Sequence, residues 1–280
     1  MRGTAVGGSD YYLEPNTSDV EAETSNVYTV TPTGFTQDNF GASRTYIYMA
    51  IRAPMMVEPE VGTDVFAVKS YTGIGGNRTL DAAFGPVDMA IAKRLADSSA
   101  AINLTTRLTS KEFSTNVGDP EGSFNFVNLE SNSLVVPGSY FSNSSGIPYG
   151  LWAWKRAKGF FDVVAYDGTD TYRWQSHSLG AVPEMIWVKG RTADVSWAVY
   201  HKDVGSSKYL MLNDDAGQIS SSSRWGGSDP TDSLFRLGSS SMVNAASDTY
   251  VAYLFTTLDG ISKCGSYVGN GTNQIISCGF

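Results

Sequence analysis

The sequence predicts an all-β protein built from tandem antiparallel β-sandwich-like repeats of about 100 residues each. Two observations predict this class: short runs of β-branched and aromatic residues bounded by turn residues, and a set of sequence markers that recurs along the chain. The composition agrees with it. Aromatic residues make up 12% of the chain and charged residues only 17%, whereas about 25% charged residues is typical of soluble domains.

Each complete repeat is expected to hold about six or seven short strands. Large apolar residues recur at every second position, as in Trp152 and Trp154 or Tyr253 and Phe255, which places them on one face of a strand, the expected core face. In the repeat that is easiest to delimit, we expect strands at 161–166, 185–190, 197–202, 208–213, 234–238 and 249–255.

The segments between strands carry little helical signal. The best candidate helix is short and spans 19–26. The polar stretches 129–148 and 220–233 contain Gly and Pro and are expected to be exposed connections.

Two markers recur in the same order along the chain, roughly 100 residues apart. The first is the strand-like segment at 45–52, 148–155 and 249–256, which contains Tyr46, Tyr149 and Tyr250 respectively. The second contains Tyr71, Tyr166 and Tyr267.

These markers divide the chain into two complete and two partial repeats. We favour the interpretation that the chain is a piece of a longer repeat protein. The alternative is a set of circularly permuted domains whose halves combine. The predicted parts are the second half of a repeat at 1–51, an insertion or linker at 52–64, complete repeats at 65–156 and 157–257, and the opening of a further repeat at 258–280.

Charge and hydropathy exclude several classes of protein. The net charge is −8 and no Lys/Arg cluster is present, so we expect no nucleic-acid partner. No apolar run approaches the ~20 residues that span a bilayer, so membrane insertion is not expected. Met1-Arg2-Gly3 is followed by polar residues, and therefore no secretory signal is visible.

The sequence offers no convincing catalytic constellation. His177 and His201 lack a nucleophile motif near them and are expected to be structural. The acidic pairs are expected to cap turns, with calcium binding as the alternative. We therefore expect no enzyme and no catalytic, cofactor-binding or metal-binding residues. The acidic pairs considered are Asp167 with Asp170 and Asp214 with Asp215.

The two cysteines cannot build a disulfide framework or a zinc site by themselves. Cys264 and Cys278 are expected to be free thiols, and a bond between them across a hairpin is the alternative.

Three aromatic residues lie in polar loops where no core pattern explains them. Trp225, Tyr140 and Phe141 could stack on sugar rings or anchor a protein partner at the surface. The favoured alternative is that each ring packs under its own loop or on a neighbouring repeat.

Several segments together resemble a repeat unit of tail-fibre-like virion structural proteins from tailed bacteriophages of marine bacteria, which often occurs beside concanavalin A-like lectin domains. The resemblance covers nearly the whole chain, implies a structural role in a virion, and brings no known catalytic or binding residues. The segments that carry it are RTYIYMAIRAPM (44–55), LWAWKRAKGFFDVVAYDG (151–168), HSLGAVPEMIWVKGR (177–191), WAVYHKD (197–203) and TYVAYLFTTLDGISKCGSYVGNG (249–271).

The expected function is therefore that of a structural component of a phage virion, a tail fibre or another surface appendage assembled in the host cytoplasm. The expected partners are other copies of the chain, in a trimer by analogy with other appendages, and other virion proteins. The alternative is a glycan-binding adhesin for host attachment, whose partner is host-surface glycan.

Overall fold

The structure is a computed structural model, which describes residues 10–12, 22–24, 28–31, 34–37, 56–96, 100–109, 111–130, 133–138 and 140–280. The chain divides into two compact units, Met1–Ala53 and Pro54–Phe280. The described part of the first unit is two antiparallel strand pairs: β1 (Asp10–Tyr12) with β2 (Ala22–Thr24), and β3 (Tyr28–Thr31) with β4 (Gly34–Gln37).

The prediction of a short helix at 19–26 is wrong for the residues of that segment that the structure describes. Ala22–Thr24 is strand β2, in register with Asp10–Tyr12. Pairing with another strand outweighs the weak helical preference of so short a segment.

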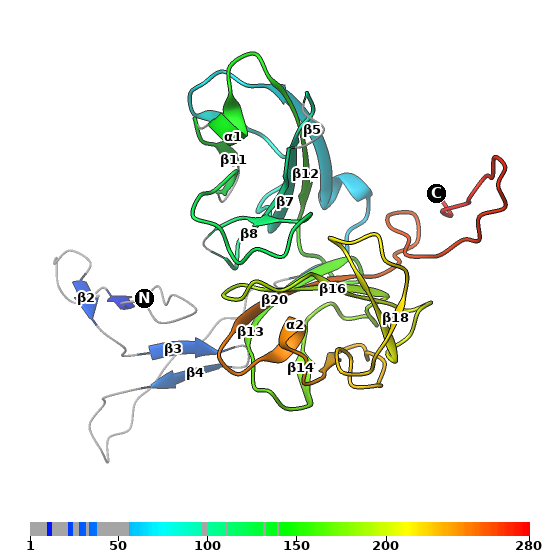
Figure 1. The fold of residues 1–280 in the computed structure, drawn as a ribbon. Coiled ribbons are helices and arrows are strands. Elements are labelled where there is room, and N and C mark those ends of the chain that lie inside the picture. Colours follow the sequence, from blue (N-terminus) through cyan, green and yellow to red (C-terminus); the bar gives the residue numbers. More distant parts are fainter. Residues whose placement is uncertain are drawn as a thin grey trace. The chain divides into compact units, whose positions relative to one another are not determined.

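The second unit contains two β-sandwich-like halves, which we call the first and second sandwich (Figure 1). The large sheet of the first sandwich has the strand order β5-β12-β7-β8-β9, and a smaller sheet has the order β10-β11-β6. The elements, preceded by the 3-10 turn Gly62–Asp64, are β5 (Phe66–Thr72), β6 (Arg78–Leu80), β7 (Met89–Arg94), β8 (Ile102–Thr106), β9 (Phe113–Ser114), β10 (Asn128–Leu129), β11 (Leu134–Val136), α1 (Tyr140–Asn143) and β12 (Pro148–Trp154).

The second sandwich repeats this plan. Its large sheet has the order β13-β20-β15-β16-β17-β18, and β14 pairs with β19 in a separate two-stranded sheet. All pairings in both sandwiches are antiparallel, and no described strand pairs across from one sandwich to the other. The elements are β13 (Phe161–Asp167), β14 (Arg173–Ser176), β15 (Met185–Gly190), β16 (Ala198–His201), β17 (Lys208–Met211), β18 (Ile219–Ser220), β19 (Leu234–Leu237), α2 (Ser241–Asn244) and β20 (Thr249–Phe255).

The protein is thus all-β, as the sequence predicts, with antiparallel sandwich-like packing. The six strands expected in the second sandwich are all present, with bounds that differ by no more than about two residues, as is usual for strand ends. The stretch 129–148 is less exposed than expected, because it contains β11, whose Leu134 and Val136 are fully buried.

Four of the six recurring tyrosines are explained by one packing arrangement that occurs twice. Tyr267 is 70% exposed and takes no part in it, and Tyr46 lies outside the described residues. Tyr71 of β5 lies opposite Tyr149 of β12, and their rings stack at 5.0 Å; Tyr166 and Tyr250 stack in the same way at 5.4 Å. The Tyr166 hydroxyl donates to the carbonyl oxygen of Val243 in α2 (2.9 Å). These tyrosines therefore fix the one-turn helix of each sandwich against its large sheet.

Strand β20 has two buried faces. Tyr250, Ala252 and Leu254 point into the core of the second sandwich, while Val251 and Tyr253 belong to a separate cluster shared with the first sandwich. The prediction that the alternating large residues share one strand face is confirmed, but the prediction that this face is the sandwich core is wrong. Tyr253 and Phe255 lie in the cluster shared with the first sandwich. In β12 the core face likewise carries Tyr149, Leu151 and Ala153 in place of Trp152 and Trp154.

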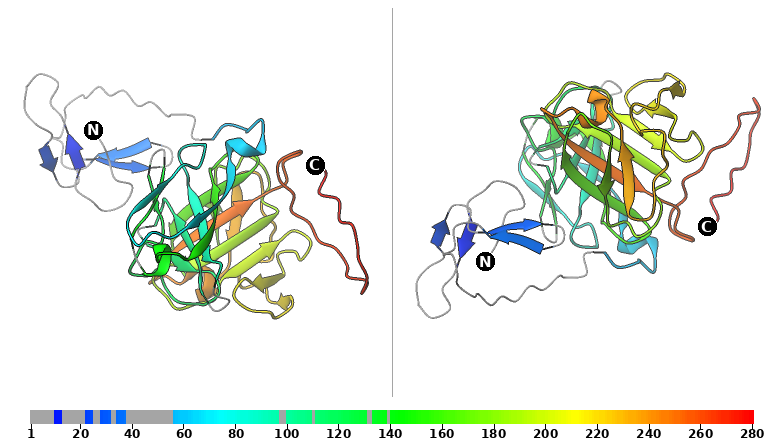
Figure 2. Two further views of the ribbon diagram at one scale, coloured as in Figure 1. Left: turned by 90° about the horizontal axis from the view of Figure 1, so that it is seen from above. Right: turned by 90° about the horizontal axis from the view of Figure 1, so that it is seen from below.

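Residues 265–280 follow the second sandwich as an extended segment outside both sandwiches, drawn in red (Figure 2). Within the described residues, no helix is long and apolar enough to cross a membrane.

Candidate functional site at the junction of the two sandwiches

The outer faces of the two large sheets meet in an apolar cluster, which we call the junction core. It combines side chains of both sandwiches with those of the connecting segment 155–160. Its buried members are Val65, Met89, Leu104, Phe113, Ala157, Phe160, Phe161, Val163, Trp197, Val251 and Tyr253.

Trp197 is the largest side chain of the junction core and is fully buried. Its ring meets the Phe113 ring edge-on at 5.9 Å, and its indole Nε1 donates to the carbonyl oxygen of Ser114 at 3.1 Å. Its backbone N–H donates to Oδ1 of Asn213 (2.9 Å), which holds the start of β16 in place. Trp197 thus joins the two sandwiches through both its apolar ring and its polar atom.

Lys189 of β15 is fully buried at the edge of this core. Its Nζ donates to three backbone carbonyl oxygens: Gly118 of the first sandwich (2.8 Å), Val195 (2.8 Å) and Gly190 (3.2 Å). A buried ammonium needs such partners, because removing a charge from water is costly. Burial lowers the pKa of Lys189 to about 8, against the opposing effect of the carboxylates of Asp194 and Asp119.

The loop that carries Gly118 approaches the second sandwich very closely. A Cβ at this position would lie 3.0 Å from Oδ1 of Asp194 and 3.3 Å from the carbonyl carbon of Val195. A glycine therefore allows its carbonyl to reach Lys189.

An ion pair near Lys189 also connects the two sandwiches. Arg191 Nε lies 2.9 Å from Oε2 of Glu121, and the Glu121 backbone N–H donates to the carbonyl oxygen of Arg191 at 2.8 Å. Glu121 belongs to the first sandwich and Arg191 follows β15, so the pair spans the junction. Its side-chain and backbone bonds together fix the register of the two segments.

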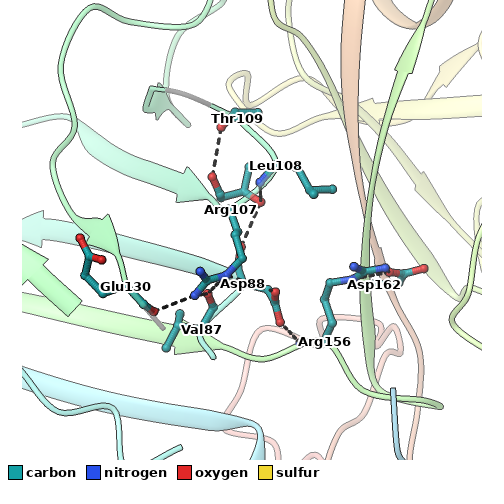
Figure 3. A network of polar contacts seen from close by, with 9 residues as sticks. Val87, Asp88, Arg107, Leu108, Thr109, Glu130, Arg156 and Asp162 are labelled. Carbon is teal, nitrogen blue, oxygen red and sulfur yellow. Dashed lines mark hydrogen bonds and ion pairs between the residues drawn. The ribbon is translucent and has the colours of Figure 1, made fainter. Parts of the chain in front are cut away.

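The connecting segment is held by a chain of alternating charges, seen from close by in Figure 3. Arg156 donates through Nε to Oδ1 of Asp162 (2.7 Å), and its Nη2 lies 2.7 Å from the same oxygen. The Arg156 backbone N–H donates to Oδ2 of Asp88 at 2.7 Å, while Arg107 Nε lies 3.7 Å from the other oxygen of Asp88. Burial raises the pKa of Asp88.

Asp162 is fully buried, and both of its carboxylate oxygens accept hydrogen bonds. Besides Arg156, the backbone N–H groups of Val163 (2.8 Å) and Ser178 (2.7 Å) donate to its two oxygens. A carboxylate that is fully buried and bonded in this way positions the chain and is not available to a substrate.

The structure corrects one predicted site residue. Trp225 is only 2% exposed and lies in the core of the second sandwich, edge-on to Tyr200 at 5.8 Å. The expectation that it binds at the surface is wrong, because its loop folds back and inserts the ring. The favoured alternative, packing under its own loop, is what the structure contains.

For the other two loop aromatics, the structure describes only the backbone. The backbone of Tyr140 and Phe141 forms the first half of α1. Their side chains lie outside the described part of the structure, so their surface-binding role remains a prediction.

The histidines have structural contacts. The His177 ring accepts from the backbone N–H of Leu179 at Nδ1 (3.2 Å), which leaves Nε2 to donate to the carbonyl oxygen of Thr231 (3.2 Å). Burial lowers the pKa of His177, which agrees with this neutral tautomer. His201 accepts from the backbone N–H of Asp203 at the end of β16.

The acidic turn residues and the cysteines do not converge on a site. Asp214 accepts from the backbone N–H of Ala216 at 2.7 Å, as expected of an Asx turn. Both Cys264, which is buried, and Cys278, which is exposed, are free thiols. Among the described residues, no group of three or more His, Cys, Asp or Glu side chains is placed to hold a metal ion.

A shallow cavity of about 250 Å³ lies on the first sandwich. Its charged lining residues are Arg107 and Glu130, and the Arg107 guanidinium is already bonded to the carbonyl oxygens of Val87 and Glu130. The Arg107 guanidinium is therefore already engaged, whereas Oδ1 of Asn125, another lining residue, is buried without a hydrogen-bond partner among the described residues.

These features define a class: a tandem β-sandwich protein whose consecutive repeats share a buried junction. The chain belongs to the family described as a domain of unknown function (DUF7483), whose model matches residues 61–280. No curated protein and no solved structure matches the chain.

Proposed function

We propose that this protein is a structural component of a bacteriophage virion, part of a tail fibre or another surface appendage. The observation that supports this role best is the junction core. Two sandwiches that bury a tryptophan and a lysine between them, and that a half-buried ion pair also connects, form a stiff pair, whereas repeats joined only by a linker move independently.

A stiff array of repeats suits a protein that must keep its length and direction. In repeat proteins each unit contacts its neighbours, and the repeated interface sets the geometry of the whole array. The sequence resemblance to tail-fibre-like proteins supports the same role, and the acidic net charge of −8 suits a protein present in many copies. The proposal assigns the chain no catalytic activity and no cofactor.

The proposed partners are other copies of the chain, in a trimer, and neighbouring virion proteins. Light scattering coupled to size-exclusion chromatography of the purified chain tests the first of these. A mass of three chains that persists on dilution supports the trimer, and a single-chain mass at every concentration contradicts it.

The virion role is tested on purified phage particles. We expect peptides from residues 61–280 in the mass spectrum of particles banded by density, and gold-labelled antibodies against the chain on the tail or on surface fibres. The proposal fails if the chain is missing from banded particles while it is present in the infected cells.

A further inference from the structure

Two exposed aromatic rings and an arginine share the outer face of the β14–β19 sheet. Trp174 is 40% exposed and Tyr172, immediately before β14, is 48% exposed. Arg236 of β19 lies directly opposite Trp174 in the strand register. Its guanidinium carbon is 5.2 Å from the centre of the Trp174 ring and 6.0 Å from that of Tyr172. We call these three residues the aromatic platform.

Arg236 differs from the arginines of the junction. Arg156 and Arg191 each bind a carboxylate, whereas Arg236 has no acidic partner and no hydrogen bond within the described part of the chain. Its Nε is covered and lacks an acceptor, so the terminal nitrogens are the donors available to a ligand. A positive charge held between rings without a counter-ion is complementary to an anion.

A glycine in the neighbouring turn packs closely against two residues of the aromatic platform. Gly226 has a φ of +60°, and a Cβ there would lie 2.8 Å from Cγ of Arg236 and 3.1 Å from Cδ1 of Tyr172. The backbone of the 225–227 turn therefore packs against the platform and limits the movement of Arg236 and Tyr172.

The first sandwich shows that the fold does not require the platform. The sheet register places Thr79 and Val135 where the second sandwich has Trp174 and Arg236. A neighbouring arginine is present in both: Arg78 lies over Tyr71 at 5.8 Å and Arg173 over Tyr166 at 5.3 Å. Residues present in both sandwiches serve the architecture, and those present in one need another explanation.

We propose that the aromatic platform binds a carboxylate-bearing sugar, such as a uronic acid residue of a polysaccharide. The apolar C–H face of the sugar would stack on the Trp174 and Tyr172 rings, and the terminal nitrogens of Arg236 would donate to the carboxylate. The aromatic platform would give the alternative function, glycan binding for host attachment, a site other than Trp225. The proposal does not depend on the virion role.

The test uses two probes that differ only in their carboxylates. These are a tetramer of β-1,4-linked mannuronate and a tetramer of β-1,4-linked mannose, titrated into the full chain by calorimetry and by tryptophan fluorescence. We expect the mannuronate tetramer to bind at least about tenfold more tightly, because the mannose tetramer lacks the carboxylate that accepts the charged hydrogen bond from Arg236. Arg236→Gln keeps the rings and should abolish this preference, and Trp174→Ala should weaken binding of the mannuronate tetramer at least tenfold.

Tyr267→Ala provides a matched control, because Tyr267 is a 70% exposed aromatic residue in the extended segment 265–280, outside both sandwiches (Figure 2). This variant should bind as the unchanged protein does, and circular dichroism checks that all variants are folded. The proposal is overturned if the mannuronate tetramer shows no binding at about 1 mM, if both probes bind equally, or if Arg236→Gln leaves the preference intact. Binding of acidic peptides with no binding of either sugar would also overturn it and would indicate a protein partner.

Discussion

The Nζ of Lys189 lies 2.8 Å from the carbonyl oxygen of Gly118, so a fully buried ammonium group of the second sandwich is bonded to the backbone of the first. The same nitrogen also donates to Val195, within its own sandwich. The Lys189 side chain therefore connects the first-sandwich loop that contains Gly118 with the loop that follows β15.

Lys189→Met should destabilise the protein by about 2–4 kcal/mol, because it leaves the carbonyl oxygens of Gly118 and Val195 buried without donors. The measurement is urea unfolding followed by tryptophan fluorescence. Lys93→Met is the matched control, since Lys93 is a half-buried lysine near the end of β7, the strand that corresponds to β15. The control should change the free energy of unfolding by less than about 1 kcal/mol, and equal losses in both variants would contradict the assignment.

The lysine also predicts a pH dependence of stability. Burial lowers the pKa of Lys189 to about 8 in the folded protein, whereas an unfolded lysine titrates near 10.4. The unfolded state therefore holds more protons between these values, and stability rises with pH across this window. The free energy of unfolding of the unchanged protein, relative to Lys189→Met, should increase by about 1–3 kcal/mol between pH 8 and pH 10. A flat difference would show that the folded pKa is not lowered.

Asp162→Asn should cost about 3–5 kcal/mol, because it leaves the guanidinium of Arg156 without its buried counter-ion. Thermal unfolding and urea unfolding both report this loss. Asp215→Asn, at an exposed turn position, should have an effect below about 0.5 kcal/mol. If the two substitutions have the same effect, the charge chain at the connecting segment has no structural importance.

Trp225→Ala should lower stability by about 3–5 kcal/mol, as expected when a buried aromatic ring is removed. Trp174→Ala removes a ring that is 40% exposed and should cost about 1 kcal/mol or less. Unfolding curves of the two variants, measured side by side, distinguish the core tryptophan from the surface one. The reverse order of the two losses would refute the assignment of Trp225 to the core.

The two thiols should react at very different rates. Burial raises the pKa of Cys264 to about 11, so little reactive thiolate forms at pH 8, whereas Cys278 is exposed. Ellman's reagent should therefore label one thiol rapidly in the native protein and the second only after unfolding. Cys278→Ser should remove the rapid phase, and two rapid phases in the native protein would contradict the burial of Cys264.

Strand positions were predictable because local composition decides them. The β-branched and aromatic runs at 161–166 and 249–255 are bounded by turn residues, and the structure has β13 and β20 there. The tyrosine markers were also informative, since Tyr71 and Tyr149 lie opposite each other in one sheet.

The burial of the Trp225 ring could not be predicted from the sequence. Trp225 has polar neighbours and reads as exposed, but Gly226, in a left-handed conformation, follows it where the loop turns back. The ring then reaches Tyr200, which is distant in sequence, and no local pattern encodes such a contact.

The junction and the platform were missed for related reasons. A lysine at the end of a strand reads as a solvated side chain, so Lys189 gave no signal of burial. Tyr172 and Trp174 stand two residues apart, and the same alternation describes a core face or an exposed face. Which face is covered depends on the packing of whole sheets, which the sequence of one strand does not specify.

The junction core also affects how the chain must be made. The outer face of the first large sheet is complete once β12 has left the ribosome, but its cover, including Trp197 and Tyr253, is synthesised later. At about 5–20 residues per second, the intervening hundred or so residues take roughly 5–20 s. During that interval nascent chains on one messenger carry the same uncovered apolar face, and crowding on a polysome would favour contact between them before each acquires its own second sandwich.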